Sequence, residues 1–135
     1  MKFKKKDTIN PRKVAEFVIA AHHQFDEVQE MVEEDPRLVN ASLDMGNGDW
    51  ESALDGAAHM GRADIARYLI EHGARIDFLY IAAMLDEIEI VKAIMTAFPK
   101  AHETAGVHGF TLRHFAETGQ ATQVLDYLDS IEKSD

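Results

Sequence analysis

The sequence predicts an all-α fold in which short helix-turn-helix pairs stack into a solenoid, with one short β-hairpin. The clearest pair lies in residues 52–77, where Gly61 separates two helical segments and Gly73 ends the second. A glycine at a helix end supplies the left-handed backbone that residues with a β-carbon resist. Apolar residues in the second segment recur at helical spacing. Neither helix is long enough to bury its apolar side alone, so the pair has to stack on similar units.

Residues 52–61, with the sequence SALDGAAHMG, carry the most specific pattern in the chain. They fill a ten-position order of threonine, proline, leucine, histidine, any residue, two alanines, two free positions and glycine. The GARID sequence of residues 73–77 matches the glycine-alanine segment that closes such a unit. The unit resembles an ankyrin repeat, although it departs from the family pattern at the threonine, proline and histidine positions. This resemblance implies an ankyrin-repeat solenoid that binds another protein.

Further copies of the unit are marked by alanine pairs that begin at residues 20, 57 and 82. The steps between them are 37 and then 25 residues, against about 33 in the family. The short step leaves no room for a hairpin between the second and third repeats. We therefore expect one domain over residues 1–135. Its expected parts are a basic arm of residues 1–10, repeats at about 11–43, 44–77, 78–106 and 107–130, and a polar tail of residues 131–135.

The residue at the turn between the two helices of a repeat is expected to have a positive φ. Alignment of the four repeats puts these residues at that turn: Gln24, Gly61, Asp86 and Gly119. The distance from Ala83 to Ala116 is 33 residues, which is the family step. However, residues 109–112 match the family's glycine-any-threonine-proline order one position out of step with Gly119. The register of the fourth repeat therefore stays open by one residue.

A β-hairpin is expected around Met45 to Trp50, because Asn47-Gly48 is a strong signal for a tight turn. In the ankyrin family this segment is a finger that projects from the stack. Trp50 falls near the position where the family usually has glycine. It is either packed against a neighbouring finger or exposed as an anchor for a partner, since tryptophan is favoured at interface hot spots.

Charge is distributed unevenly, because residues 1–13 carry a net charge of +5 while the whole chain carries −10. The acidic body is expected to repel nucleic acid. The basic arm is either a solvated terminus or a weak tether to anionic surfaces. The chain has no cysteine, no signal-peptide pattern and no apolar run of membrane-spanning length. We therefore expect a cytoplasmic protein without a membrane span.

Motifs for catalysis or cofactor binding are missing from the sequence. It contains no glycine-rich phosphate loop and no GxSxG nucleophile motif. A zinc site needs three or four converging ligands, and the spacing of the seven histidines shows no such set. We predict no catalytic residue, no metal site and no cofactor.

The resemblance implies that the two free residues before each turn face a concave groove where a partner docks. Stacking in sequence order would align them in one row of His22, His59, Met84 and Glu117 and a second row of His23, Met60, Leu85 and Thr118. Trp50 and Glu51 of the finger complete the predicted partner-binding set. The alternative for Met84 and Leu85 is that they simply pack in the core.

The function expected from these observations is that of a monomeric protein-protein interaction module without enzymatic activity. The acidic charge favours a partner with a basic surface. Two alternatives are a hydrolase that uses histidine and carboxylate, and a self-associating structural module. The first lacks any visible grouping of nucleophile, base and orienting residue. A concentration-dependent mass would support the second.

Overall fold

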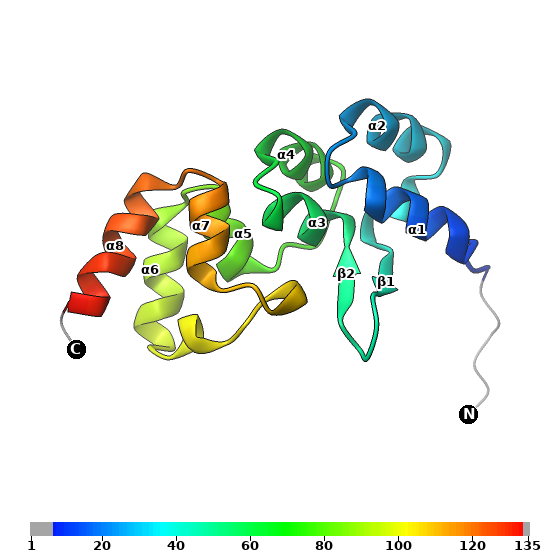
Figure 1. The fold of residues 1–135 in the computed structure, drawn as a ribbon. Helices are drawn as coiled ribbons and strands as arrows, with labels where there is room; N and C mark the ends of the chain where they lie inside the picture. Colours follow the sequence, from blue (N-terminus) through cyan, green and yellow to red (C-terminus); the bar gives the residue numbers. More distant parts are fainter. Residues whose placement is uncertain (1–6, 134–135) are drawn as a thin grey trace.

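The computed structural model describes residues 7–133, and within this range eight α-helices form four consecutive pairs. The pairs are α1 (Pro11–Ala20) with α2 (Phe25–Glu34), α3 (Ala53–His59) with α4 (Ala63–Glu71), α5 (Phe78–Met84) with α6 (Ile88–Ala97), and α7 (Leu112–Thr118) with α8 (Thr122–Lys133). Three short 3-10 helices join them: η1 (Pro36–Asn40), η2 (Ala101–Glu103) and η3 (Val107–Gly109). The pairs follow one another along an elongated molecule, with α1 and α2 far from α8 (Figure 1). The predicted all-α repeat fold is therefore confirmed.

The predicted finger is present as a two-stranded antiparallel sheet of β1 (Ser42–Asp44) and β2 (Trp50–Ser52). Leu43 pairs with Glu51 in its register. The Asp44 carboxylate accepts hydrogen bonds from the backbone N–H groups of Gly46 and Gly48, which fixes the turn. The finger projects beside α1 and α3 (Figure 1). Residues 72–77, between α4 and α5, form no strand, as the short repeat step predicts.

Side-chain caps mark the starts of α1 and α3. Ser52 occupies the family's threonine position and still caps α3, because its hydroxyl accepts from the Asp55 N–H while the Asp55 carboxylate accepts from the Ser52 N–H. Asn10 caps α1 by accepting from the N–H of Arg12, and Pro11 stands at the first helical position. Departure from the family sequence at residues 52 and 55 therefore leaves the start of α3 intact.

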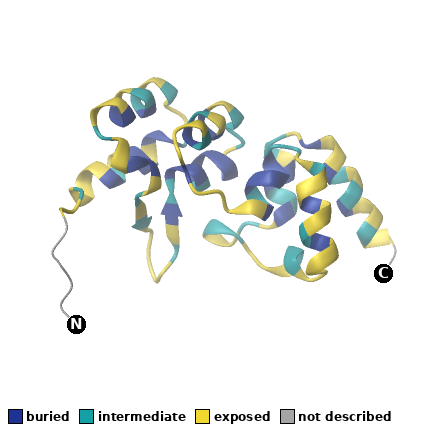
Figure 2. Ribbon diagram, turned by 180° about the vertical axis from the view of Figure 1, so that it is seen from behind, coloured by how far each residue is buried: buried dark blue, intermediate teal, exposed yellow. Residues whose placement is uncertain are grey.

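The first helices of the pairs make the central packing of the stack: α1 contacts α3, α3 contacts both α5 and α7, and α5 contacts α7. Ala57 and Ala58 of α3 are fully buried, which lets neighbouring helices approach closely. Buried residues gather where the helices face one another (Figure 2). A β-carbon on Gly61 would lie 2.2 Å from the Thr118 carbonyl oxygen, so the turn after α3 lies against the end of α7. At the turn end of the helices, the second repeat therefore lies against the fourth. The predicted stacking of the repeats in sequence order is wrong there.

Backbone dihedrals settle the register of the fourth repeat. Positive φ occurs at Gly61 (68°), Asp86 (59°) and Gln120 (54°), whereas Gly119 has φ −82°. The turn residue of the fourth repeat is therefore Gln120, and Thr118, not Glu117, is equivalent to His59. Glycine at 119 has another cause, because a β-carbon there would lie 2.0 Å from the Met84 carbonyl oxygen.

The first repeat differs from the other three at its turn. Gln24 has φ −117°, so the prediction of a positive φ at this residue is wrong. The N–H of Gln24 bonds the carbonyl of Ala20, four residues back, whereas that of Arg62 bonds the carbonyl of Ala57, five residues back. The hydrogen-bonded turn that ends α1 is therefore one residue shorter than the one that ends α3, and it contains no left-handed residue.

The predicted ends of the chain lie partly outside the described residues. The basic arm falls there over residues 1–6, and the tail over residues 134–135. The part of the predicted tail that is described, residues 131–133, belongs to α8 and not to a polar tail. Among residues 7–133, no helix combines the length and the apolar character needed to cross a bilayer.

Candidate functional site

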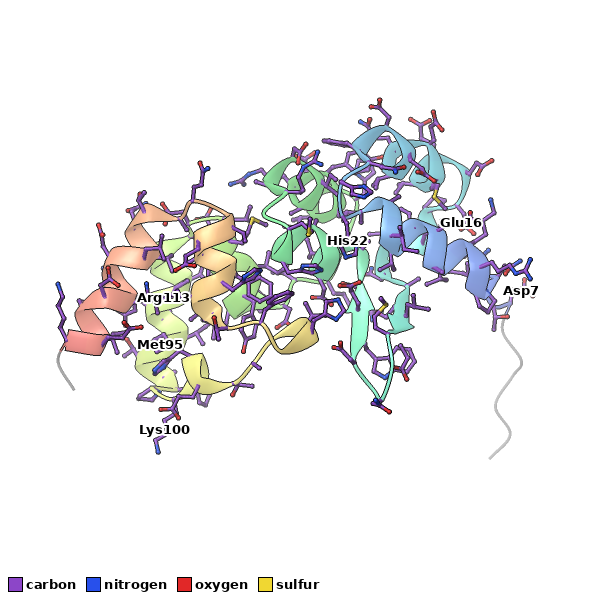
Figure 3. The ribbon with its side chains drawn as sticks, viewed as in Figure 1. Asp7, Glu16, His22, Met95, Lys100 and Arg113 are labelled. Carbon is purple, nitrogen blue, oxygen red and sulfur yellow. The ribbon has the colours of Figure 1, made fainter. Side chains whose placement is uncertain are left out.

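Four side chains from distant parts of the chain converge at the base of the finger, and we call them the His–Glu cluster: His22, Glu51, His59 and His108. His22 follows α1, Glu51 lies on β2, His59 is the last residue of α3, and His108 lies in η3. The Nε2 atom of His59 lies 3.0 Å from Nε2 of His22 and 3.0 Å from Oε2 of Glu51. The Nε2 atom of His108 lies 2.5 Å from the same Glu51 oxygen. Figure 3 labels His22 where α1 approaches α3.

Glu51 reaches the cluster because alternate strand residues point to opposite faces of the finger. It is fully buried, whereas its neighbour Trp50 is 60% exposed. Among the described residues, its Oε1 atom has no hydrogen-bond partner, and His22 Nε2 lies 3.4 Å from it. A fully buried carboxylate with one unbonded oxygen is costly unless positive charge lies next to it.

Packing leaves room for the imidazole rings and covers them. A β-carbon on Gly56 would lie 2.8 Å from the His22 ring, so glycine at this position of α3 makes space for it. Phe110 stacks on His59 with ring centroids 5.2 Å apart, and His114 stacks on Phe110 at 4.0 Å. The Nε2 atom of His114 lies 3.0 Å from the backbone carbonyl oxygen of His59. This aromatic column links the cluster to α7, on which His114 lies.

Outer hydrogen bonds fix the orientation of two of the rings. The Nδ1 atom of His22 donates to the Val18 carbonyl at 2.8 Å. The Nδ1 atom of His108 donates to Asp49 Oδ2 at 2.6 Å, and the backbone N–H of His108 donates to Asp49 Oδ1 at 3.1 Å. The backbone bond from His108 to Asp49 occurs at a residue with φ 55°, in the left-handed region that residues with a β-carbon adopt infrequently.

The electrostatics follow from these contacts. Burial alone raises the pKa of the Glu51 carboxyl, but contacts with His22 and His59 outweigh it and bring the pKa to about 2. The interaction with Glu51 raises the pKa of His22. Burial lowers the pKa of His108, but the carboxylates of Asp49 and Glu51 outweigh it and raise the pKa. The hydrogen bond from His108 lowers the pKa of Asp49.

The repeat that contributes Glu51 and His59 matches a known family. Residues 49–78 match the ankyrin repeat. The chain contains an ankyrin repeat. No curated protein and no solved structure matches the chain. Ankyrin repeats are generally protein-interaction modules and are typically non-enzymatic.

The ankyrin register explains part of the cluster. His22 and His59 occupy equivalent positions in the first two repeats, and the prediction that they lie side by side agrees with their 3.0 Å contact. The spacing of the histidines predicted no converging set of metal ligands, but the fold brings four such side chains together. Ligand atoms of the four side chains all lie within 4.8 Å of one another. His108 was missed because it lies in a loop outside the repeat pattern, where spacing carries no information.

The predicted partner-binding residues divide by burial. Glu51, His59 and Met84 are buried, so they are not free to contact a partner. Met84 is core, as the alternative interpretation held, and Leu85 is half-buried. The predicted residues that are exposed are His23, Trp50, Met60 and Glu117, while His22 and Thr118 are half-buried. The predicted rows are therefore not a continuous binding surface.

The finger of this ankyrin repeat presents the most prominent predicted anchor. Trp50 is 60% exposed, so it is not packed against a neighbouring finger. Met45, at the other side of the turn, is also exposed. A second apolar surface lies where the finger is missing, between α4, α5 and α6. It is a groove of about 350 Å³ lined in part by Ile76, Phe78 and Leu85.

Proposed function

We propose that this ankyrin repeat protein binds a partner protein through its finger, residues 42–52, with Trp50 as the anchor. The observation that carries the proposal is a tryptophan 60% exposed on a hairpin. An exposed indole is costly in water and is among the side chains that contribute most at interfaces.

The finger is held in place before any partner arrives. Asp44 fixes the turn, and Asp49 bonds both the backbone and the side chain of His108. Glu51 anchors β2 in the His–Glu cluster. A preorganised segment loses little conformational entropy on binding, so more of the free energy of burying Trp50 goes into affinity.

Charge supports a basic partner. The chain carries a net charge of −10, and complementary charge raises the association rate and disfavours acidic competitors. Affinity for such a partner is expected to fall as salt rises.

Two alternatives receive less support. The structure does bring three histidines and a carboxylate together, as a hydrolase would need. However, Glu51 is fully buried and His59 nearly so, and both face one another instead of a substrate. Self-association through the groove beside α5 would use Phe78, which is 59% exposed.

The experiment compares two variants of similarly exposed aromatic residues. The immobilised full chain captures proteins from an extract of its source cells, alongside Trp50→Ala and the matched control Phe78→Ala. A partner identified by mass spectrometry is then purified and titrated. We expect Trp50→Ala to weaken binding by at least about 30-fold and Phe78→Ala to leave it unchanged.

Other outcomes reject the proposal. Loss of binding in Phe78→Ala alone would move the interface to the groove beside α5. If no protein is captured selectively and the mass of the purified chain rises with concentration, self-association is the better function.

A further inference from the structure

We propose that the His–Glu cluster is a binding site for one divalent transition-metal ion of the zinc class. The inference goes beyond protein binding and does not depend on it, because it rests only on the side chains at the base of the finger. It assigns His22, His59 and His108 as nitrogen ligands through Nε2 and Glu51 as the oxygen ligand.

The positions of these atoms suit a four-coordinate ion. Zinc binds imidazole nitrogen at about 2.0–2.1 Å, which puts neighbouring ligands of a tetrahedral site about 3.3 Å apart. The observed separations are 3.0 Å for His22–His59, 3.0 Å for His59 to Glu51 Oε2 and 2.5 Å for His108 to Glu51 Oε2, while the other Glu51 oxygen, Oε1, lies 3.4 Å from His22. The four ligand atoms lie within 4.8 Å of one another, so shifts of about 1 Å or less complete the site.

The hydrogen bonds made by the Nδ1 atoms of His22 and His108 direct the Nε2 lone pairs of these rings into the cluster. Val18 offers only a carbonyl oxygen and Asp49 only a carboxylate, so the Nδ1 atoms of His22 and His108 must carry the protons. In the neutral rings, both Nε2 lone pairs then face the Glu51 carboxylate. Such an arrangement is repulsive unless a proton or a metal ion lies between the groups. Glu51 Oε1, buried and without a hydrogen bond, is a further free ligand atom.

The surroundings have the form of an outer ligand shell. Histidines that bind metals usually donate the other ring nitrogen to a carbonyl or a carboxylate, which fixes the ring and strengthens the ligand. Val18 serves His22 in this way, and Asp49 serves His108. The strained φ of 55° at His108 is what directs its ring to Glu51 while its N–H reaches Asp49.

The donor set selects the class of ion. Three imidazoles and one carboxylate suit zinc and its first-row neighbours, whereas magnesium and calcium prefer all-oxygen sites. Four protein ligands in a largely buried position are typical of a structural site and not of a catalytic one. The side chains of His22 and His108 are 19% and 25% exposed, so an ion can reach the site from solvent.

The ion would hold together segments that the chain separates widely. It would join the end of the first helix of the first repeat, the finger and first helix of the second, and the loop before the fourth. Metal binding adds its free energy to folding when the unfolded chain lacks the site. The finger would be the segment most directly stabilised, since Glu51 lies on β2.

The test uses the full chain depleted of metal by a chelator. Calorimetric titration with zinc is expected to show one ion per chain, and titration with cobalt(II) to show the visible absorption of a four-coordinate site. Glu51→Gln and His22→Gln each remove a ligand, while His23→Gln removes a neighbouring exposed histidine as the matched control. Asp49→Asn leaves all four ligands and is expected to weaken zinc binding by about 10–100-fold.

Each result decides the question. Loss of more than about 100-fold in Glu51→Gln and His22→Gln, with no change in His23→Gln, supports the site. Absence of zinc binding by the folded wild-type chain overturns it, as does an equal loss in His22→Gln and His23→Gln. Circular dichroism of each variant without metal shows whether it is folded. If a ligand variant unfolds, the wild-type titration and Asp49→Asn decide.

Discussion

The Nε2 atoms of His22 and His59 lie 3.0 Å apart, although 37 residues separate them in the chain. They stand at equivalent positions of adjacent repeats, so the residue at this position in one repeat contacts the equivalent residue of the next. In a stack of repeats, a residue at such a position meets its equivalents, and two histidines there create a place for a proton or a metal ion. Glu51 and His108 then complete the cluster from outside the two helices.

Gly56 controls this contact without taking part in its chemistry. In Gly56→Ala the new methyl group would lie 2.8 Å from the His22 ring, which must move away. Alanine favours the helix by about 1 kcal/mol over glycine, which offsets the loss of the His22 contacts. We expect the free energy of unfolding without metal to change by less than about 1 kcal/mol, while zinc affinity falls by about 10–100-fold.

Urea denaturation and calorimetry measure the two quantities separately. A zinc affinity unchanged by Gly56→Ala would show that His22 is not a ligand.

Gly119 is required for a different reason, the close approach of α7 to α5. Its φ of −82° suits any residue, but a β-carbon would overlap the Met84 carbonyl oxygen at 2.0 Å. Because backbone cannot yield as a side chain does, Gly119→Ala should lower the free energy of unfolding by about 3 kcal/mol or more.

Gly73→Ala is the matched control for Gly119→Ala. Gly73 has a φ of 92° and no atom near its would-be β-carbon, so only backbone strain of about 1–2 kcal/mol is expected. Urea denaturation gives both values. An equal loss of unfolding free energy in Gly73→Ala and Gly119→Ala would mean that α5 and α7 can move apart at no energetic cost.

The sequence was sufficient to predict the helix pairs, the finger and the missing second finger. Those features depend on local signals: the glycine after α3, Asn47-Gly48, and the interval between alanine pairs. The contact of α7 with α3 could not be predicted in this way. It depends on the path of the irregular loop over residues 98–111, whose length and composition do not set a direction.

The site was only half predictable for a related reason. His22 and His59 follow from the repeat register, and strand alternation could have indicated that Glu51 points away from the exposed Trp50. His108 has no such signal, because its position depends on a left-handed backbone held by Asp49. The turn at Gln120 was also missed, since Gly119 appeared to fill the place that glycine usually takes.

Gln120 now becomes the position where glycine should stabilise the protein. Gln120 is exposed with φ 54°, so Gln120→Gly relieves strain and is expected to raise the free energy of unfolding by about 0.5–1 kcal/mol after the added entropy of the unfolded chain. Gln24→Gly is the control, because φ −117° carries no such strain. It should lower stability by about 0.5–1 kcal/mol.

Asp86 shares the positive φ but is not an equivalent test. Its carboxylate accepts hydrogen bonds from the N–H of Val124 and the side chain of Gln123, which glycine would lose. Thermal melting of Gln120→Gly and Gln24→Gly checks the prediction for Gln120. A lower melting temperature for Gln120→Gly than for Gln24→Gly would contradict the register assigned to the fourth repeat.

The pH dependence of the metal-free protein follows from the signs of the shifts in the His–Glu cluster. The pKa of Glu51 falls from about 4.5 to about 2, so its contribution to stability is present above pH 4.5 and is lost as pH falls toward 2. The pKa values of His22 and His108 are raised above 6.5, so their contribution is present below pH 6.5 and is lost as pH rises through the folded values. In chelator, the cluster therefore contributes most between about pH 4.5 and 6.5.

Zinc should change the alkaline side of this profile. It replaces the protons between the ligands, and its affinity rises as the imidazoles become neutral. With excess zinc at pH 8, the free energy of unfolding should therefore exceed that in chelator at the same pH. His22→Gln should flatten the loss of stability above pH 6.5 in chelator, whereas His23→Gln should keep the wild-type profile. A chelator profile that is the same in His22→Gln and in the wild type would show that the cluster does not carry the shared positive charge.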